Sequence, residues 1–248
     1  MTKVETYRKK LRTLVSWEAY LLDESRLPGP RANLELAFAV ALEASEEQLI
    51  RYAELDPDEA ARDTKEEFLA VCGVIGLGYL AARHQGQHFD MLRRCASDPR
   101  WRIREAVALG LQKYGEDHFE KLLEMMVDWS RGSLLEKRAA IATLCEPKLL
   151  REEKNALRVM ELLDSVTSSL LDESDRRNKD FRVLRKTLGY AWSVVVVVQP
   201  GDGKTRMEKW IRSKDKDLRW VMKNNLRKNR LIKMDPDWVE AKIRELSE

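Results

Sequence analysis

Four side chains near the C-terminus combine aromatic and cationic chemistry at helical spacing. Trp220, Lys223, Asn224 and Arg227 recur at i, i+3, i+4 and i+7, which places them on one face of a helix. Cationic and amide groups suit phosphate oxygens, and an indole ring can stack on a nucleobase. The alternative is that Trp220 packs on a neighbouring hairpin or on the segment around Trp238, which would leave a merely solvated face.

The charge of the chain is distributed unevenly, although its net charge at pH 7 is only +3. Residues 176–233 contain 18 Lys or Arg against five Asp or Glu, a net charge of +13, whereas residues 43–67 carry −7. Such asymmetry favours a polyanionic partner for the basic part; the alternative is that the two parts complement each other or that the basic face is only solvated. The candidate residues for a nucleic-acid or partner groove are Arg182, Arg185, Lys186, Arg219, Trp220, Lys223 and Arg227.

Histidine and cysteine form no recognisable metal or catalytic pattern. His84 and His88 are four residues apart and could share a helix face, but a metal site needs a third ligand, and their polar surroundings indicate a helix end. Cys72, Cys95 and Cys145 are widely spaced and odd in number, which favours buried or half-buried thiols in a reducing cytoplasm. We therefore expect no metal site and no catalytic residue.

A run of five valines, 194–198, precedes Gly203-Lys204-Thr205 and imitates a strand that leads into a phosphate loop. Such a loop needs another glycine five residues before Gly203, because its backbone N–H groups must wrap the phosphates, and that position is Val198. Pro200 also removes one N–H donor. We predict no nucleotide cofactor and an inner helix over 183–198, in which burial overrides the weak helix propensity of valine.

The composition predicts a helical chain with a substantial core. Of 248 residues only 18 are Gly or Pro, 44% are apolar and 35% are charged. The longest uncharged runs, 68–82 and 187–201, have 15 residues each, fewer than the roughly 20 of a membrane span, so no membrane partner is expected. Apolar residues at helical spacing predict one amphipathic helix over 4–22, and Asn33 can cap the next helix.

The helix expected over 68–78 is apolar on all sides and must be surrounded by protein. Its glycines at 73, 76 and 78 reduce helix propensity, so we expect them to let a neighbouring helix approach closely. Thr64, followed three residues later by Glu67, has the pattern of a capping box at the start of this helix.

A helical hairpin recurs along the chain after Phe89. The second helix of each copy carries an arginine, at 104, 138, 185 and 219, so the spacings are 34, 47 and 34 residues. Such a period indicates an α-solenoid, in which stacked hairpins share a core that no single hairpin could bury.

The segment 98–106, Asp-Pro-Arg-Trp-Arg-Ile-Arg-Glu-Ala, resembles a HEAT-like repeat, and the resemblance extends over about residues 60 to 235. It implies an all-α fold, a right-handed α-α superhelix of stacked hairpins. It also implies structural roles for Asp98 and Arg104, which would cap helices and bridge neighbours. We expect one solenoid domain over 1–248, with capping helices in 1–60, repeats in 61–235 and a C-terminal cap in 236–248.

The chain also resembles the class of HEAT-like DNA alkylation repair proteins and bacterial alkylpurine DNA glycosylases. It shares with that class its length, its helicity, its seven tryptophans and its basic C-terminal half. Proteins of that class are α-solenoids with a basic, aromatic-lined concave face. The catalytic Trp-x-x-x-Asp of that class is absent, and the nearest match is Trp101 with Glu105. If this chain were an enzyme, the resemblance would imply a glycosylase.

These observations lead to two functional hypotheses. The first is a non-catalytic, cytoplasmic helical-repeat scaffold that binds a protein partner through its groove. The alternative is a nucleic-acid-binding solenoid that uses the basic C-terminal face, with the relation to DNA repair that the resemblance above implies. Neither hypothesis involves a small-molecule cofactor, and a salt titration of nucleic-acid binding separates the two.

Overall fold

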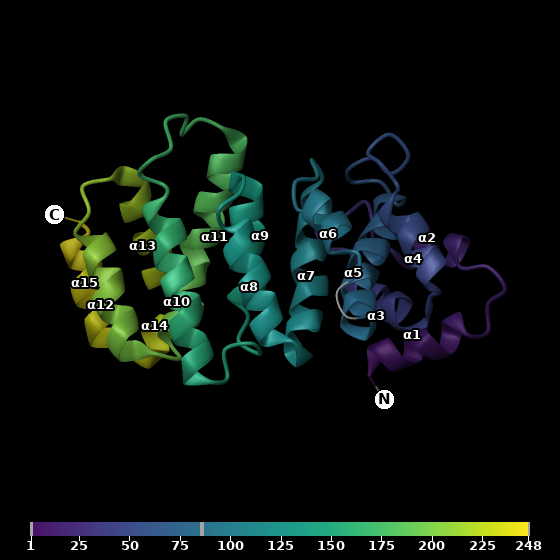
Figure 1. Ribbon diagram of the computed structural model, residues 1–248, viewed down its shortest axis with the longest axis horizontal. Coiled ribbons are helices and arrows are strands. Elements are labelled where there is room, and N and C mark those ends of the chain that lie inside the picture. The colour runs from purple at the N-terminus through teal and green to yellow at the C-terminus, as the bar shows by residue number, and fades with distance from the viewer. Residues whose placement is uncertain (1, 85–86, 248) are drawn as a thin grey trace. The chain divides into compact units, whose positions relative to one another are not determined.

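The computed structural model describes residues 2–84 and 87–247, and within them the chain is all-α, with fifteen helices and no strand (Figure 1). The helices are α1 (Lys3–Leu11), α2 (Glu18–Glu24), α3 (Leu34–Glu43), α4 (Glu46–Ala53), α5 (Glu67–Arg83), α6 (Phe89–Cys95), α7 (Trp101–Asp117), α8 (Phe119–Trp129), α9 (Leu134–Leu144), α10 (Glu153–Ser168), α11 (Lys179–Val196), α12 (Pro200–Ile211), α13 (Lys216–Leu226), α14 (Asn229–Met234) and α15 (Pro236–Glu245). Over the same residues, no helix combines the length and the apolar character needed to cross a bilayer.

The chain divides into two compact units, Met1–His118 and Phe119–Glu248. In the first unit, α3 packs on α1, α5 on α3 and α7 on α5, so each helix contacts the one two places further along. In the second unit, α9, α11 and α13 pack in the same way, while α8, α10 and α12 each pack on the helix that follows. Within each unit this is a stacked helical arrangement. The single domain over 1–248 stays a prediction.

All four hairpins predicted after Phe89 are present, as α6 with α7, α8 with α9, α10 with α11, and α12 with α13. The third copy is longer because ten residues, 169–178, connect α10 to α11. In the first copy, Asp98 and Arg104 make contacts within their own turn, and no side chain caps the start of α7, so the capping role that the resemblance implied for Asp98 is not seen there. The Asp98 carboxylate accepts from the backbone and guanidinium of Arg100, and Arg104 donates to the carbonyl groups of Asp98 and Pro99.

The glycines of α5 allow close helix packing, as predicted. A Cβ added to Gly73 would lie 2.2 Å from the backbone nitrogen of Ala53, and one added to Gly76 would lie 2.3 Å from Leu49. The atoms close to Gly73 belong to the backbone and cannot move aside, so only glycine at this position allows α4 and α5 to meet at this separation.

The N-terminal helix predicted over 4–22 is interrupted between α1 and α2. The indole N–H of Trp17 donates to the Leu11 carbonyl at 3.0 Å and satisfies a carbonyl group at the end of α1. The apolar periodicity continues across this break because each helix buries a leucine, Leu11 in α1 and Leu21 in α2. The single-helix prediction was therefore wrong.

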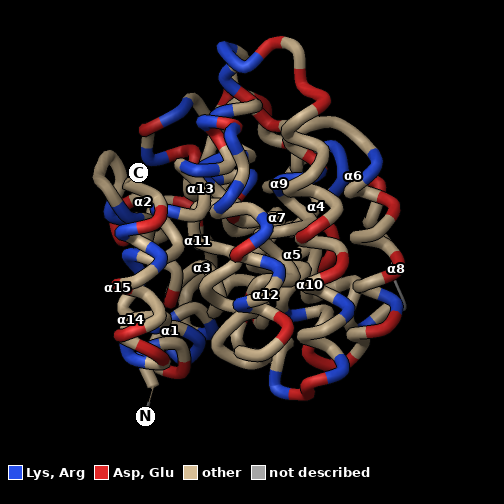
Figure 2. The backbone as a smooth tube through the Cα atoms, turned by 90° about the vertical axis from the view of Figure 1, so that its left-hand side faces the viewer, with Lys and Arg blue, Asp and Glu red and all other residues tan. Residues whose placement is uncertain are grey.

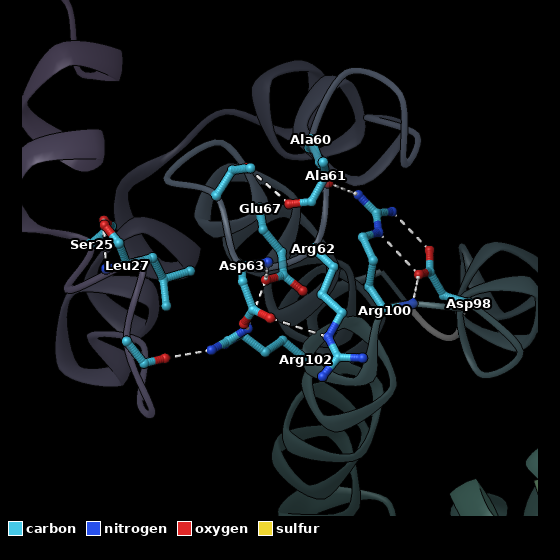
Figure 3. Close-up of polar contacts among 12 residues, drawn as sticks. Ser25, Leu27, Ala60, Ala61, Arg62, Asp63, Glu67, Asp98, Arg100 and Arg102 are labelled. Carbon is cyan, nitrogen blue, oxygen red and sulfur yellow. Dashed lines mark hydrogen bonds and ion pairs between the residues drawn. The ribbon is translucent and has the colours of Figure 1, made fainter. Parts of the chain in front are cut away.

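The capping box predicted from Thr64 and Glu67 is also wrong, because α5 begins at Glu67 itself. The Glu67 carboxylate accepts from the backbone N–H of Asp63 at 3.0 Å and from the buried guanidinium of Arg102 at 2.9 Å. Figure 3 shows Arg102 reaching from α7 toward Asp63 and Glu67. The glutamate is therefore engaged by a charge 35 residues away in the sequence, which a local pattern does not include.

The valine run is helical, as predicted, and most of it lies in α11. Trp192 and the valines at 194, 195 and 196 are buried, so packing stabilises a sequence that prefers strands. Gly203 and Lys204 lie inside α12, where Lys204 forms an ion pair with Asp235. The segment that imitated a phosphate loop is therefore part of a helix.

Candidate functional site

The candidate groove lies in the second unit, over the helices α11 and α13. The residues of α13 that face the core, Leu218, Val221, Met222 and Leu226, are all buried, as their spacing requires. Lys223 and Arg227 are exposed on the opposite side, while Trp220 and Asn224 are half-buried between the two. The face predicted from the sequence is therefore present.

A buried asparagine fixes the relative position of the two helices. The Asn225 side-chain amide donates to the carbonyl groups of Leu188, at 2.8 Å, and Val221, at 2.9 Å. Its side-chain oxygen accepts from the backbone N–H of Ser193 at 2.9 Å. A one-turn slip of α13 along α11 would leave these buried groups unpaired, so the groove has a rigid base.

Trp220 is held by contacts within the protein. The guanidinium of Arg185 lies over its ring, 4.5 Å from the centroid, in a cation–π contact. The ring also crosses α11 at Gly189, where an added Cβ would lie only 3.1 Å from Trp220 Cζ3. One face of the indole is thus already covered, and the ring supports Arg185.

Two aspartates at the start of α13 position the neighbouring arginines. Asp217 is buried and accepts from Arg185 and from Arg176, the latter at 3.1 Å. Asp215 caps α13 and also forms an ion pair with Arg176. Burial opposes ionisation of Asp215, but its hydrogen bonds with Arg176 and the α13 backbone outweigh this and lower its pKa.

Two hollows of about 660 and 360 Å³ adjoin along this face and share Arg182 and Arg185. The larger is bordered by the connection before α11 and the start of α13, and the smaller lies between the middle parts of α11 and α13. The larger is lined by Ser174, Asp175, Arg176, Arg177, Arg182, Arg185, Lys216 and Asp217. The smaller is lined by Arg182, Arg185, Lys186, Gly189, Tyr190, Trp220, Asn224 and Lys228.

Much of the positive charge on this face is not neutralised. On this face of the described chain, seven cationic side chains have no hydrogen-bond or ion-pair partner: Arg177, Arg182, Lys186, Lys216, Lys223, Arg227 and Lys228. Arg185 uses one terminal nitrogen on Asp217, while its buried Nε has no partner. Figure 2 marks the Lys and Arg positions along α13 and its neighbours in blue. The arrangement can bind several negative charges in a row.

The structure brings together most of the predicted groove residues. Arg182, Arg185, Lys186 and Trp220 line the hollows, and Lys223 and Arg227 are on the exposed side of the same helix α13. Arg219 differs, because its guanidinium donates to the Leu246 carbonyl at 2.7 Å and thereby holds the C-terminal segment.

Sequence reasoning missed other residues that line the groove, among them Arg176, Arg177, Lys216, Tyr190 and Lys228. Lys228 is eight residues after Trp220, so extending the helical spacing by one turn could have found it. The two arginines precede α11 in the long connection, where no periodicity applies.

The nearest match to the glycosylase motif lies in the first unit. Trp101 and Glu105 both line a cavity of about 630 Å³. Glu105 is exposed and already interacts with another part of the chain. The structure thus brings the two residues to one cavity, without the aspartate that the motif requires.

In the described part of the chain, the cysteines are not activated thiols, and the potential metal ligands form no cluster. Cys72 and Cys145 are buried and Cys95 is half-buried, as predicted. Burial raises the pKa of Cys95 to about 11 and that of Cys145 to about 12, so neither is an activated nucleophile. No group of three or more potential metal ligands occurs among residues 2–84 and 87–247.

Comparison of the chain with protein-family models, with curated proteins and with solved structures found no match.

Proposed function

We propose that this chain is a non-catalytic helical-repeat protein that binds the phosphate backbone of nucleic acid through the α11–α13 groove. The single observation that carries the proposal is the row of seven unpaired cationic side chains in and beside two adjoining hollows, within the part of the chain that the structure describes. Phosphates spaced along a strand suit such a row, because each can replace the solvent around one cation.

The Arg185–Trp220 pair gives the groove its specific chemistry. Because Arg185 covers one face of the indole, a base cannot stack there without displacing the guanidinium. The indole instead holds the Arg185 guanidinium in place, and Asp217 accepts from one of its terminal nitrogens. We therefore expect contacts to phosphate that depend little on base sequence.

An acidic protein segment is the second candidate, in keeping with the expectation of a protein partner. Carboxylates also satisfy guanidinium groups, and half-buried Tyr190 and Trp220 add apolar contact area beside the cations. The two candidates differ in the number of charges engaged at once, which the dependence of affinity on salt measures.

For the fold, we propose a right-handed α-α superhelix of HEAT-like hairpins. What supports this finer assignment is the contact of each helix with the one two places along, within each unit, and the 34-residue recurrence of an arginine on the second helix of a hairpin. Stacked hairpins would keep α11 and α13 parallel neighbours, as a continuous groove requires.

The test is a titration of fluorescently labelled duplex DNA, single-stranded DNA and RNA with the full chain over a series of KCl concentrations. We expect affinity to fall steeply with salt. Replacing Lys186, Lys223 or Arg227 by Gln should each reduce the slope of log affinity against log salt by about 0.9. The matched control is Lys121→Gln on α8, another exposed lysine without a side-chain partner in the described chain.

Two outcomes would overturn the assignment to nucleic acid. One is the absence of binding to any of the three nucleic acids at low salt. The other is equal loss of affinity in the groove variants and in Lys121→Gln, which would indicate nonspecific attraction. Tighter binding of polyglutamate than of DNA of equal charge would favour the acidic protein segment.

A further inference from the structure

We propose that the cavity in the first unit is a binding site for a small aromatic carboxylate. The site is separate from the α11–α13 groove and does not depend on the function proposed for it. The cavity has a volume of about 630 Å³, within the range of about 300 to 1,000 Å³ that small-molecule sites usually have.

The cavity has walls from three helices and one connecting segment. Leu34 and Phe38 come from α3, Val71 from α5, and Trp101 and Leu109 from α7. Apart from buried Val71, these side chains are at least partly exposed, so their apolar surface is open to a ligand. A concentration of accessible apolar and aromatic groups in one hollow of a highly charged chain favours an apolar ligand body.

The connection between α2 and α3 forms the rim and is held in place at several points. Arg102 donates to the Gly29 carbonyl at 2.5 Å, and the backbone N–H of Leu27 donates to the Ser25 hydroxyl at 3.1 Å. At its end, the buried Asn33 side chain donates to the Glu24 carbonyl at 2.9 Å. Because the rim is fixed before a ligand arrives, binding would cost little ordering of the chain.

The aromatic wall is also fixed. The guanidinium of Arg102 lies over the Trp101 ring, 4.5 Å from its centroid, while Arg102 itself is anchored by Asp63 and Glu67 (Figure 3). A held indole together with Phe38 on the facing helix suits a flat ring better than a flexible aliphatic chain.

The charges around the cavity favour an anion. Arg31 has no side-chain partner among the described residues, whereas the charges of Arg26 and Glu35, which form an ion pair at 3.8 Å, offset each other. Arg102 is engaged by Asp63 and Glu67, and Glu105 already interacts elsewhere in the chain. The charge that remains available to a ligand is therefore the Arg31 guanidinium, which pairs well with a carboxylate.

The experiment uses the full chain and 2-naphthoate as the probe, with binding followed by the NMR signal of the Trp101 indole N–H, assigned with Trp101→Phe. We expect a saturable shift of that signal. The neutral analogue 2-naphthamide should bind about tenfold more weakly, because it lacks the charge that meets Arg31. Arg31→Gln should remove the preference for the acid, whereas Arg83→Gln, an exposed arginine of α5 outside the cavity, should retain it.

Leu109→Trp, which fills the cavity from α7, should abolish binding of both naphthalene compounds in a chain that stays helical by circular dichroism. If this variant fails to fold, the exposed Arg31→Gln variant still decides the matter. The proposal is overturned if 2-naphthoate gives no saturable shift at millimolar concentration, or if the acid and the amide bind equally well. Decanoate binding as tightly as 2-naphthoate would overturn the aromatic assignment.

Discussion

Gly78 and Gly110 meet where α5 crosses α7, and a Cβ added to Gly78 would lie 2.2 Å from the carbonyl carbon of Gly110. The clash would be with backbone, so no side-chain rotation can relieve it. The extensive packing of α5 on α7 therefore depends on the absence of a side chain at this crossing.

Gly78→Ala should destabilise the first unit by about 2 to 3 kcal/mol, because the two helices must move apart. Urea unfolding followed by circular dichroism measures this cost. Gly201→Ala in α12 is the matched control, because an added Cβ there meets nothing within 4 Å, and its unfolding midpoint should stay the same or rise slightly. Equal midpoints for both variants would contradict the packing argument.

Asn225→Ala should destabilise the second unit by about 2 kcal/mol or more, because it removes three buried hydrogen bonds between or within α11 and α13. The adjacent Asn224→Ala provides the comparison, since that side chain is half-buried and donates only to the Trp220 carbonyl. We expect Asn224→Ala to have the smaller effect in the same urea experiment. The reverse order would show that Asn225 does not hold the two helices.

The stability of the first unit should depend on pH through Glu43. Hydrogen bonds from Arg12 and Arg8, at 2.7 and 2.6 Å, outweigh burial and lower the pKa of Glu43 to about 2. Because the folded pKa lies below the ordinary value of 4.5, this stabilisation is complete above pH 4.5 and is lost as the pH falls toward 2.

Glu43→Gln should therefore lower the unfolding midpoint at pH 7 and change it little at pH 2. The measurement is the urea midpoint of both proteins at several pH values between 2 and 7. Glu47→Gln is a suitable control, because Glu47 is exposed on α4 and has no side-chain partner in the described chain. A constant difference between Glu43→Gln and the unaltered chain across this range would contradict the assignment to Glu43.

The chain should release no base from alkylated DNA. The motif position that carries aspartate in the glycosylase class holds Glu105, whose side chain is exposed and engaged within the protein. The assay compares the unaltered chain with Glu105→Gln on alkylated duplex DNA and measures free base by chromatography. Base release that disappears in Glu105→Gln would show that the chain is a glycosylase after all.

Periodicity predicted α3, α5 and the four hairpins because burial of one face imposes it directly on the sequence. The close contacts at Gly73, Gly76 and Gly78 were predictable too, because glycine weakens a buried helix unless a neighbour needs the space of its missing side chain. Patterning could not locate the break before Trp17, because Leu11 and Leu21 on its two sides continue the same apolar spacing.

Only those groove residues that lie on helix faces could be predicted from the sequence. Lys186 and Trp220 lie on helix faces, where spacing determines direction, whereas Arg176 and Arg177 come from a connection whose path depends on Asp215 and Asp217. Arg219 is not available to the groove because its guanidinium donates to the Leu246 carbonyl. That hydrogen bond depends on where the C-terminal segment packs, and no local sequence pattern contains that information.

The valine run at the end of α11 also has a consequence for the unfolded chain. The valines within α11, at 194, 195 and 196, are helical only because neighbouring helices enclose them, and the whole run includes neither a charge nor a proline. Once heat or denaturant separates α11 from its neighbours, such a segment favours extended strands that pair between molecules. We expect heated samples to form β-rich aggregates and to refold poorly on cooling, with replacement of Val197 by Lys as a way to delay aggregation.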